Sequence, residues 1–151
     1  MTLAFRNVDA NVSDPVGSWP QEALQAALER GDLSHWRRIS AEIRAWPWGR
    51  VARTVEEILT YSRPYGVAGL MERAIEAARQ RSVRSEVQEV ADRIRMFQEL
   101  SRLTVSEYAS LVGTSRSRMS TYLAGKVVPS AAMLVRMERA ATMNKHETGC
   151  R

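Results

Sequence analysis

Apolar side chains recur every three or four residues through most of the N-terminal half of the chain. Spacing of this kind gives a helix one apolar face. The stripes are Leu24, Ala27 and Leu28; Leu33, Trp36, Ile39, Ile43 and Trp46; Val51, Val55, Ile58 and Leu59; and Val67, Leu70, Met71, Ala74, Ile75 and Ala78. No segment between residues 18 and 80 alternates with period two or carries an Asn-Gly or Asp-Gly hairpin signal. We therefore predict an all-α chain in which residues 18–80 form a module of about four helices.

Polar residues and prolines mark where these helices are expected to begin. The first helix is expected to start at Trp19 or Pro20, because Ser18 can cap it and proline suits a first turn. Asp32 is expected to cap the second helix. Residues 1–17 show no period and are rich in Asn, Asp, Pro and Gly, so we expect a flexible arm there.

A second group of helices is expected after residues 79–85, a polar and basic segment that is either a hinge or a junction between helices. The stripe that predicts a fifth helix, ending near Ser101, consists of Val83, Val87, Val90, Ile94 and Phe97. A short helix is predicted from about Thr104 to Val112, and Ser130 is expected to cap the last helix. Residues 143–151 are expected to be a flexible tail.

The stretch between these two predicted helices has the composition of a loop but the spacing of a helix-turn-helix. Ala109 is small where a second helix would pack, and Gly113, four residues later, tolerates the positive φ that the turn needs. Ser115 stands where a cap would be. The apolar residues that would face inward around the turn are Tyr108, Val112, Met119 and Tyr122. A helical hairpin within a larger bundle is the alternative, but it does not explain the polar and basic first turn after Ser115.

These residues carry a family resemblance. The segment LTVSEYASLVGTSRSRMSTYLAGKVVPS, residues 103–130, resembles the helix-turn-helix of the phage lambda repressor/Cro family, also called the XRE family. The matching positions are Leu103, Ala109, Val112, Gly113, Ser115, Arg116, Ser117, Met119, Ser120, Gly125, Lys126, Pro129 and Ser130. The resemblance implies a five-helix DNA-binding domain over residues 83–142. It also implies that the domain binds double-stranded DNA as a homodimer on a pseudo-palindromic site.

The same resemblance implies roles for particular side chains. By position, Arg116, Ser117 and Arg118 would face base edges, with Thr121 close by. The residues that would touch phosphates are Thr104, Ser106, Ser120 and Lys126. Two positions depart from the family pattern: Val105 replaces a frequent glutamine that holds the DNA backbone, and Leu111 replaces a residue that is usually polar. Leu111 is expected either to be covered by the N-terminal region or by a partner, or to be a single tolerated surface leucine.

The distribution of charge agrees with a nucleic-acid surface in the C-terminal half. Residues 1–80 carry ten Lys/Arg and ten Asp/Glu, whereas residues 81–151 carry twelve against seven. The whole net charge of +5 therefore lies after residue 80. An ordinary solvated basic face is about as common as a nucleic-acid surface, so charge alone does not decide between them.

The sequence lacks the residue patterns that catalysis, cofactor binding or a membrane span would require. The two histidines, His35 and His146, are far apart in sequence, and the lone Cys150 can build neither a disulfide nor a zinc site. No phosphate-binding glycine motif occurs. We therefore expect no enzyme and no cofactor or metal. No apolar run is long enough to span a membrane, and the N-terminus lacks a signal-peptide pattern, so a cytoplasmic protein is expected.

All four tryptophans lie in the N-terminal half, and each lies either in the core or on a surface that could bind a protein partner. Trp36 and Trp46 fall on an apolar stripe and are expected in the core, whereas Trp48 follows Pro47 in a turn and is the candidate partner-binding residue. The sequence therefore favours a transcriptional regulator, a repressor, with residues 18–80 as a partner-binding or dimerisation module. The alternative is an antitoxin that regulates its own gene and binds a toxin through residues 18–80. A purely structural helical adaptor is the third class.

Overall fold

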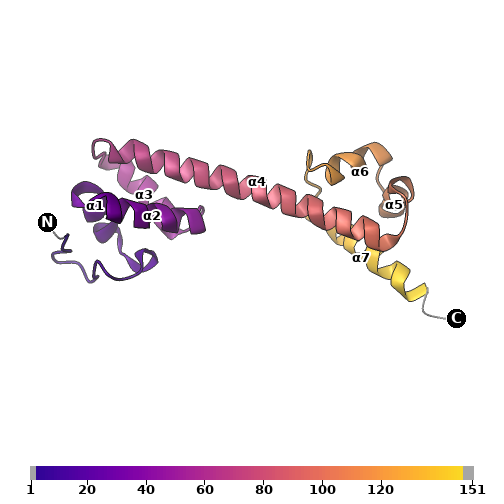
Figure 1. The fold of residues 1–151 in the computed structure, drawn as a ribbon, viewed down its shortest axis with the longest axis horizontal. Coiled ribbons are helices and arrows are strands. Elements are labelled where there is room, and N and C mark those ends of the chain that lie inside the picture. The colour runs from indigo at the N-terminus through magenta and orange to yellow at the C-terminus, as the bar shows by residue number, and fades with distance from the viewer. Residues whose placement is uncertain (1–2, 148–151) are drawn as a thin grey trace. The chain divides into compact units, whose positions relative to one another are not determined.

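The computed structural model describes residues 3–147, and the side chains up to residue 143, and it confirms the all-α class. The helices are η1 (Val16–Ser18), α1 (Gln21–Arg30), α2 (Leu33–Ala45), α3 (Arg50–Tyr61), α4 (Val67–Ser101), α5 (Val105–Val112), α6 (Arg116–Leu123) and α7 (Ala131–Glu147) (Figure 1). The described residues contain no strand. Contacts divide the chain into two compact units, Met1–Ser82 and Val83–Arg151. Within the described part, no helix combines the length and the hydropathy that crossing a lipid bilayer requires.

The N-terminal unit is a small helical bundle in which α1, α2 and α3 contact one another. Its core contains the predicted stripe residues Leu24, Leu28, Ile39 and Ile43, all of them buried. Asp32 caps α2 as expected, because its carboxylate accepts hydrogen bonds from the backbone N–H groups of two first-turn residues.

Residues 3–17 differ from the flexible arm that the sequence suggested. Leu3 and Val16 are buried in the core, and Phe5 packs edge-to-face on Trp19 with ring centroids 5.1 Å apart. Arg38 fastens the segment from α2 by donating to the carbonyls of residues 12 and 14 at 2.6 and 2.7 Å. Such contacts join residues far apart in sequence, so a search for local periodicity does not detect them.

The expected start of the first helix at Trp19 or Pro20 was early by one or two residues. Helix α1 begins at Gln21, and Pro20 stands in the cap position with no side-chain cap hydrogen bond. Trp19 lies before the helix in extended backbone and is fully buried, with its indole N–H donating to the Asp14 carbonyl. The Ser18 hydroxyl donates instead to the Pro15 carbonyl.

The expected break at residues 79–85 is absent, because α4 runs unbroken from Val67 to Ser101. The segment RQRSVRS contains neither proline nor glycine, and Arg and Gln are good helix formers, so nothing in it ends a helix. The fourth and fifth helices of the sequence prediction are thus one helix, which belongs to both units.

The C-terminal unit packs the second half of α4 with α5, α6 and α7. Its described residues hold four helical segments rather than the five that the family resemblance implied. The buried residues at its centre are Ile94, Phe97, Tyr108, Ala109, Val112, Met119, Tyr122, Met137, Ala140 and Ala141. Helix α7 continues to Glu147, beyond the expected start of the tail at residue 143, whereas residues 148–151, with Cys150, lie outside the described residues.

Candidate nucleic-acid interface

Helices α5 and α6 are joined by a tight turn built as the sequence predicted. Gly113 has φ +79°, in the left-handed region that glycine adopts without strain. Its N–H and that of Thr114 return to carbonyls of α5, which ends the helix. Ser115 then caps α6, with its hydroxyl accepting from the backbone N–H of Arg118 at 3.1 Å.

Helix α6 is held to the unit by one face only. Met119 and Tyr122 are buried against α4, α5 and α7 as expected, whereas Arg116, Ser117 and Arg118 are exposed. At about 100° of rotation per residue, Ser117 lies on the side of α6 opposite Met119. Arg116 and Arg118 lie on the two flanks, about 160° apart. The outer strip of α6 is thus formed by small polar residues, with a guanidinium on each side.

The cations of this surface have no counter-charge nearby in sequence or among the described ion pairs. Residues 108–137 contain four basic residues and no acidic one. Arg116, Arg118 and Lys126 are exposed and occur in none of the ion pairs of the described residues. Since unpaired cations on an acid-free stretch create a local positive potential, this face favours a polyanion.

The four predicted phosphate ligands lie on different parts of the unit, and all are exposed. Ser106 is in the first turn of α5, Ser120 is on α6, and Lys126 is in the loop that follows α6. Thr104 caps α5 in a reciprocal pair with Glu107, to whose carboxylate its hydroxyl donates at 2.7 Å and its backbone N–H at 2.8 Å. These bonds from Thr104 hold the pKa of Glu107 below its ordinary value, so a negative charge stands beside Thr104.

Thr121, the remaining predicted reader, is half-buried. Its hydroxyl donates to the Arg118 carbonyl at 2.7 Å. The proton of the hydroxyl is therefore used within α6, and Thr121 offers DNA an acceptor oxygen and a methyl group.

Val105 and Leu111 show the consequences of the two departures from the family pattern. Val105 packs partly buried against the core of the unit, so its side chain stabilises the fold and cannot replace the hydrogen bond of a glutamine. Leu111 is 58% exposed within the C-terminal unit.

Two arginines that the sequence did not single out hold the helix ends of the motif. Arg136 of α7 donates to the Val112 carbonyl at the end of α5, at 3.1 Å. Arg95 of α4 donates to the Leu123 carbonyl at the end of α6, at 2.9 Å. A cation at a helix C-terminus satisfies a free carbonyl and complements the helix dipole. Because each bond joins distant segments, no local sequence signal marks either residue.

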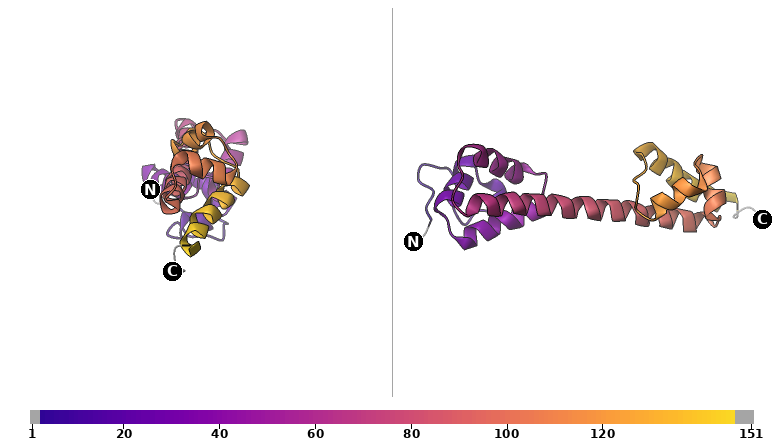
Figure 2. Two further views of the ribbon diagram at one scale, coloured as in Figure 1. Left: turned by 90° about the vertical axis from the view of Figure 1, so that its right-hand side faces the viewer. Right: turned by 90° about the horizontal axis from the view of Figure 1, so that it is seen from above.

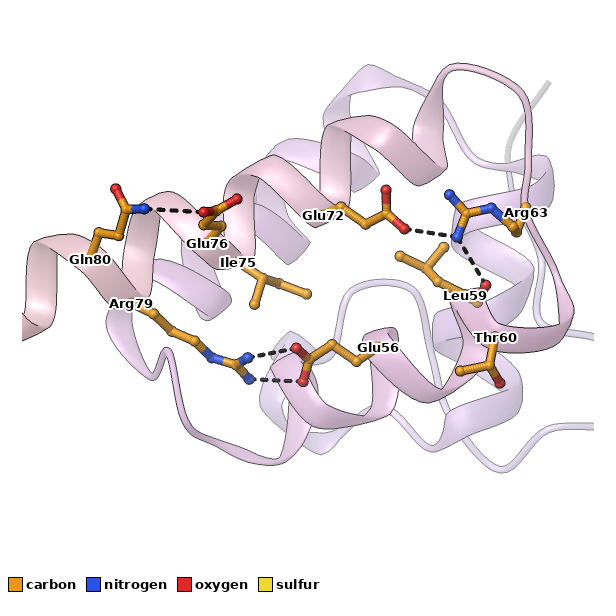
Figure 3. Close-up of a pocket in the computed structure, with 9 residues that line it drawn as sticks. All are labelled: Glu56, Leu59, Thr60, Arg63, Glu72, Ile75, Glu76, Arg79 and Gln80. Atoms are coloured by element: carbon orange, nitrogen blue, oxygen red, sulfur yellow. Dashed lines mark hydrogen bonds and ion pairs between the residues drawn. The ribbon is translucent and has the colours of Figure 1, made fainter.

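The N-terminal unit carries a different kind of surface, a groove between α3 and the first half of α4 (Figure 3). Its volume is about 530 Å³, and its floor is formed by Leu59 and Ile75. Ion pairs cross the groove near both ends: Arg79 binds the Glu56 carboxylate with both terminal nitrogens, and Arg63 donates to the carboxylate of Glu72 at 2.7 Å.

Two tryptophans of the N-terminal unit are open to solvent. Trp46 was expected in the core, but it is 68% exposed. It occupies the C-cap of α2 with non-helical φ and ψ, so the helical period no longer sets its direction. Trp48 is 55% exposed, and the Arg79 guanidinium lies 4.7 Å from its ring centroid. Trp36 is half-buried against the core and donates its indole N–H to the Ala27 carbonyl.

Comparison with known proteins gives a result for the C-terminal part of the chain. Residues 89–148 match the family model of a helix-turn-helix domain. Neither the comparison with curated proteins nor that with solved structures gave a match. The capped and glycine-turned pair α5–α6 lies inside the matched range. The C-terminal part of the chain is therefore a helix-turn-helix domain, which suggests a DNA-binding regulator.

Proposed function

We propose that this protein is a transcriptional regulator, a repressor, that binds a specific double-stranded DNA sequence. The observation that carries the proposal is the outer face of α6, where Arg116 and Arg118 flank Ser117 on an acid-free stretch of chain. Buried Met119 and Tyr122 hold this helix from behind, and Ser115 caps its first turn. A helix anchored on one face, with free donors on the other, suits insertion into a major groove.

The roles follow from the chemistry of the side chains. A guanidinium matches the O6 and N7 acceptors of guanine, so Arg116 and Arg118 are the proposed guanine readers. Ser117 and Thr121 lie toward the middle of the exposed strip and contact neighbouring base edges. Ser106, Ser120 and Lys126 bind phosphates and set the register. Thr104 binds a phosphate as well only if its hydroxyl gives up its hydrogen bond to Glu107 and donates to the phosphate instead.

The mode of action that fits this arrangement is a homodimer on a pseudo-palindromic operator. One α6 helix reads few base pairs, and two copies related by a twofold axis double the site and its specificity. Binding at a promoter would then exclude other proteins from it. The proposal includes a cytoplasmic location, no catalytic activity, and no cofactor or metal.

Selection of bound fragments from random double-stranded DNA tests the proposal. We expect an enriched motif with twofold symmetry, bound with an affinity that falls steeply as salt is raised. The control is the Arg116→Ala, Arg118→Ala double variant, which should retain helical circular dichroism but enrich no motif. Equal binding of selected and random DNA by the wild-type chain would overturn the proposal.

A second candidate, an antitoxin, is favoured by the exposure of Trp46 and Trp48 in the N-terminal unit. Exposed tryptophans are frequent at the centres of protein interfaces. In this version the helix-turn-helix domain regulates the protein's own gene while the N-terminal unit binds a toxin. A toxin-like gene directly adjacent, whose product protects Trp46 and Trp48 from quenching by acrylamide, would support it. Full operator binding without any co-purifying protein would favour the simple regulator.

A further inference from the structure

One face of α4 in the C-terminal unit is covered by the end of α6 and by the loop that follows it (Figure 2). Gly125 of this loop has φ +70°, and a Cβ built on it would lie 3.5 Å from the Cβ of Ala91 and 3.9 Å from Val87. The bond from Arg95 to the Leu123 carbonyl covers the next turn of α4. Residues 87, 91 and 95 thus mark the side of α4 on which the proposed reading helix lies.

The same face of α4 continues toward its N-terminus without this cover, and it carries Arg84. Arg84 lies seven residues before Ala91, so it points within about 20° of the same direction. It is exposed and occurs in none of the ion pairs of the described residues. Its helical neighbours three and four positions away are Gln80, Arg81, Val87 and Gln88, none of which is acidic. No neighbouring carboxylate on the helix therefore offsets its charge.

We propose that Arg84 binds a phosphate of the DNA backbone beside the phosphate bound by Lys126, and so lengthens the DNA site beyond the helix-turn-helix. This inference rests on the proposed function. Arg84 points from α4 toward the side on which α6 lies, which is the side that faces DNA. It precedes Val87, which lies under the Lys126 loop, by about 4.5 Å along the axis. Lys126 follows Gly125, which lies against Val87 and Ala91, so the two cations lie near adjacent turns of one face of α4 and suit phosphates of one stretch of backbone.

The chemistry suits phosphate rather than a base. A guanidinium binds phosphate oxygens with two parallel hydrogen bonds, and it stays charged at every physiological pH. Arg84 is not on α6, and it lies before the motif of residues 103–130 and before the range 89–148 that matches the helix-turn-helix family model. Arg84 lies on the same helix face as Ala91 only because α4 continues through residues 79–85, where a break was expected.

Helix α4 also supplies a matched control in Arg93. Arg93 is exposed, has the same side chain and lies nine residues after Arg84, so it projects from the opposite side, about 180° away. Replacing it removes the same charge from the same helix without touching the face that carries the Lys126 loop.

The experiment measures the affinity of the full chain for its selected operator between 50 and 200 mM salt. Loss of one phosphate contact lowers the slope of log affinity against log salt by about 0.9. We therefore expect the deficit of Arg84→Ala relative to wild type to shrink about 3.5-fold over this range. Arg93→Ala should keep the wild-type slope, and Arg84→Lys should recover most of the slope.

Neutral methylphosphonate groups placed one at a time along the operator then locate the contact. Neutralising one flanking phosphate should weaken the wild type and leave Arg84→Ala unchanged, which assigns that phosphate to Arg84. Equal slopes for Arg84→Ala and Arg93→Ala, in a chain that still selects its operator, would overturn the inference alone. A wild-type chain that selects no DNA at all would overturn the proposed function, and the inference with it.

Discussion

The two units of this chain differ in whether the basic residues of their candidate binding surfaces are already engaged within the protein. In the N-terminal unit, Arg38 and Arg50 bind backbone carbonyls, and Arg63 and Arg79 pair with glutamates across the α3–α4 groove. In the C-terminal unit the cations on α6 and in the following loop have no carboxylate within the residues 108–137. The first arrangement stabilises the protein itself, whereas the second leaves positive charge available to a polyanion. Net charge alone, +1 for residues 1–82 against +4 for residues 83–151, hides this distinction because it does not show which cations are already engaged.

The largest expected effects come from truncating one buried side chain in the core of each unit in turn. Met119→Ala should destabilise the C-terminal unit by about 2–5 kcal/mol, since a fully buried side chain is lost and a cavity remains. Operator binding should fall with it because α6 loses its main anchor. Leu28→Ala, equally buried in the N-terminal unit, should cost a similar amount and leave DNA affinity within a few-fold of wild type.

Urea unfolding followed by two probes separates these outcomes. All four tryptophans lie in the N-terminal unit, so their emission reports that unit alone, while circular dichroism reports both. Leu28→Ala should shift the tryptophan transition and Met119→Ala should not. A shift of the tryptophan transition by both variants to the same extent would show that α4 couples the units into one cooperative system, against our comparison.

Arg118→Ala tests whether the unpaired cations read DNA. It should cost roughly 1–3 kcal/mol of operator affinity and relax the preference at one base pair, with little change in stability. Lys126→Ala, the matched phosphate variant, should weaken all sequences alike and lower the salt slope by about one. Competition binding with selected and random duplexes measures both. Equal losses on specific and random DNA for Arg118→Ala would contradict a role in base reading.

Arg79→Ala is the complementary change in the N-terminal unit. It removes the bidentate pair with Glu56, the bond to the Pro47 carbonyl and the contact with Trp48. Since the pair and the Trp48 contact are both partly exposed, we expect a loss of about 1–2 kcal/mol of unfolding free energy. Trp48 emission should change while operator affinity does not. A drop in DNA affinity with unchanged stability would mean that Arg79 also contributes to DNA binding, against our comparison.

The sequence predicted the helix-turn-helix closely because its determinants are local. Gly113, Ser115 and the apolar residues at the turn each act within a few positions of the chain, where spacing alone fixes their roles. The N-terminal arm was predicted wrongly because its packing depends on Arg38, more than twenty residues away. Trp46 was misplaced because the helical period was applied one residue past the end of α2.

Tyr108→Phe gives the smallest expected effect and tests the internal bonding of the C-terminal unit. The Tyr108 hydroxyl is buried and donates to the Met137 carbonyl at 2.6 Å, which ties α5 to α7. Its loss should cost about 0.5–1.5 kcal/mol near neutral pH, the usual net value of one hydrogen bond. Tyr122, also buried but without a described hydrogen bond from its hydroxyl, supplies the control Tyr122→Phe.

The difference in stability between wild type and Tyr108→Phe should depend on pH, and the direction of the change follows from the pKa of Tyr108. Burial raises the pKa of Tyr108 to about 12 from the ordinary value of 10.0, so between these values the unfolded chain loses the proton while the folded chain keeps it. The folded state then binds more protons than the unfolded state, and its stability falls as pH rises from about 10 to about 12. Wild type should therefore lose stability between about pH 10 and pH 12, whereas Tyr108→Phe has no such proton to lose. The difference in unfolding free energy by which the variant is less stable should then narrow. Because Tyr108 belongs to the C-terminal unit, circular dichroism should register the narrowing and tryptophan emission should not. A deficit that stays constant from neutral pH to pH 12 would mean that the hydroxyl ionises alike in both states and is not held in the core.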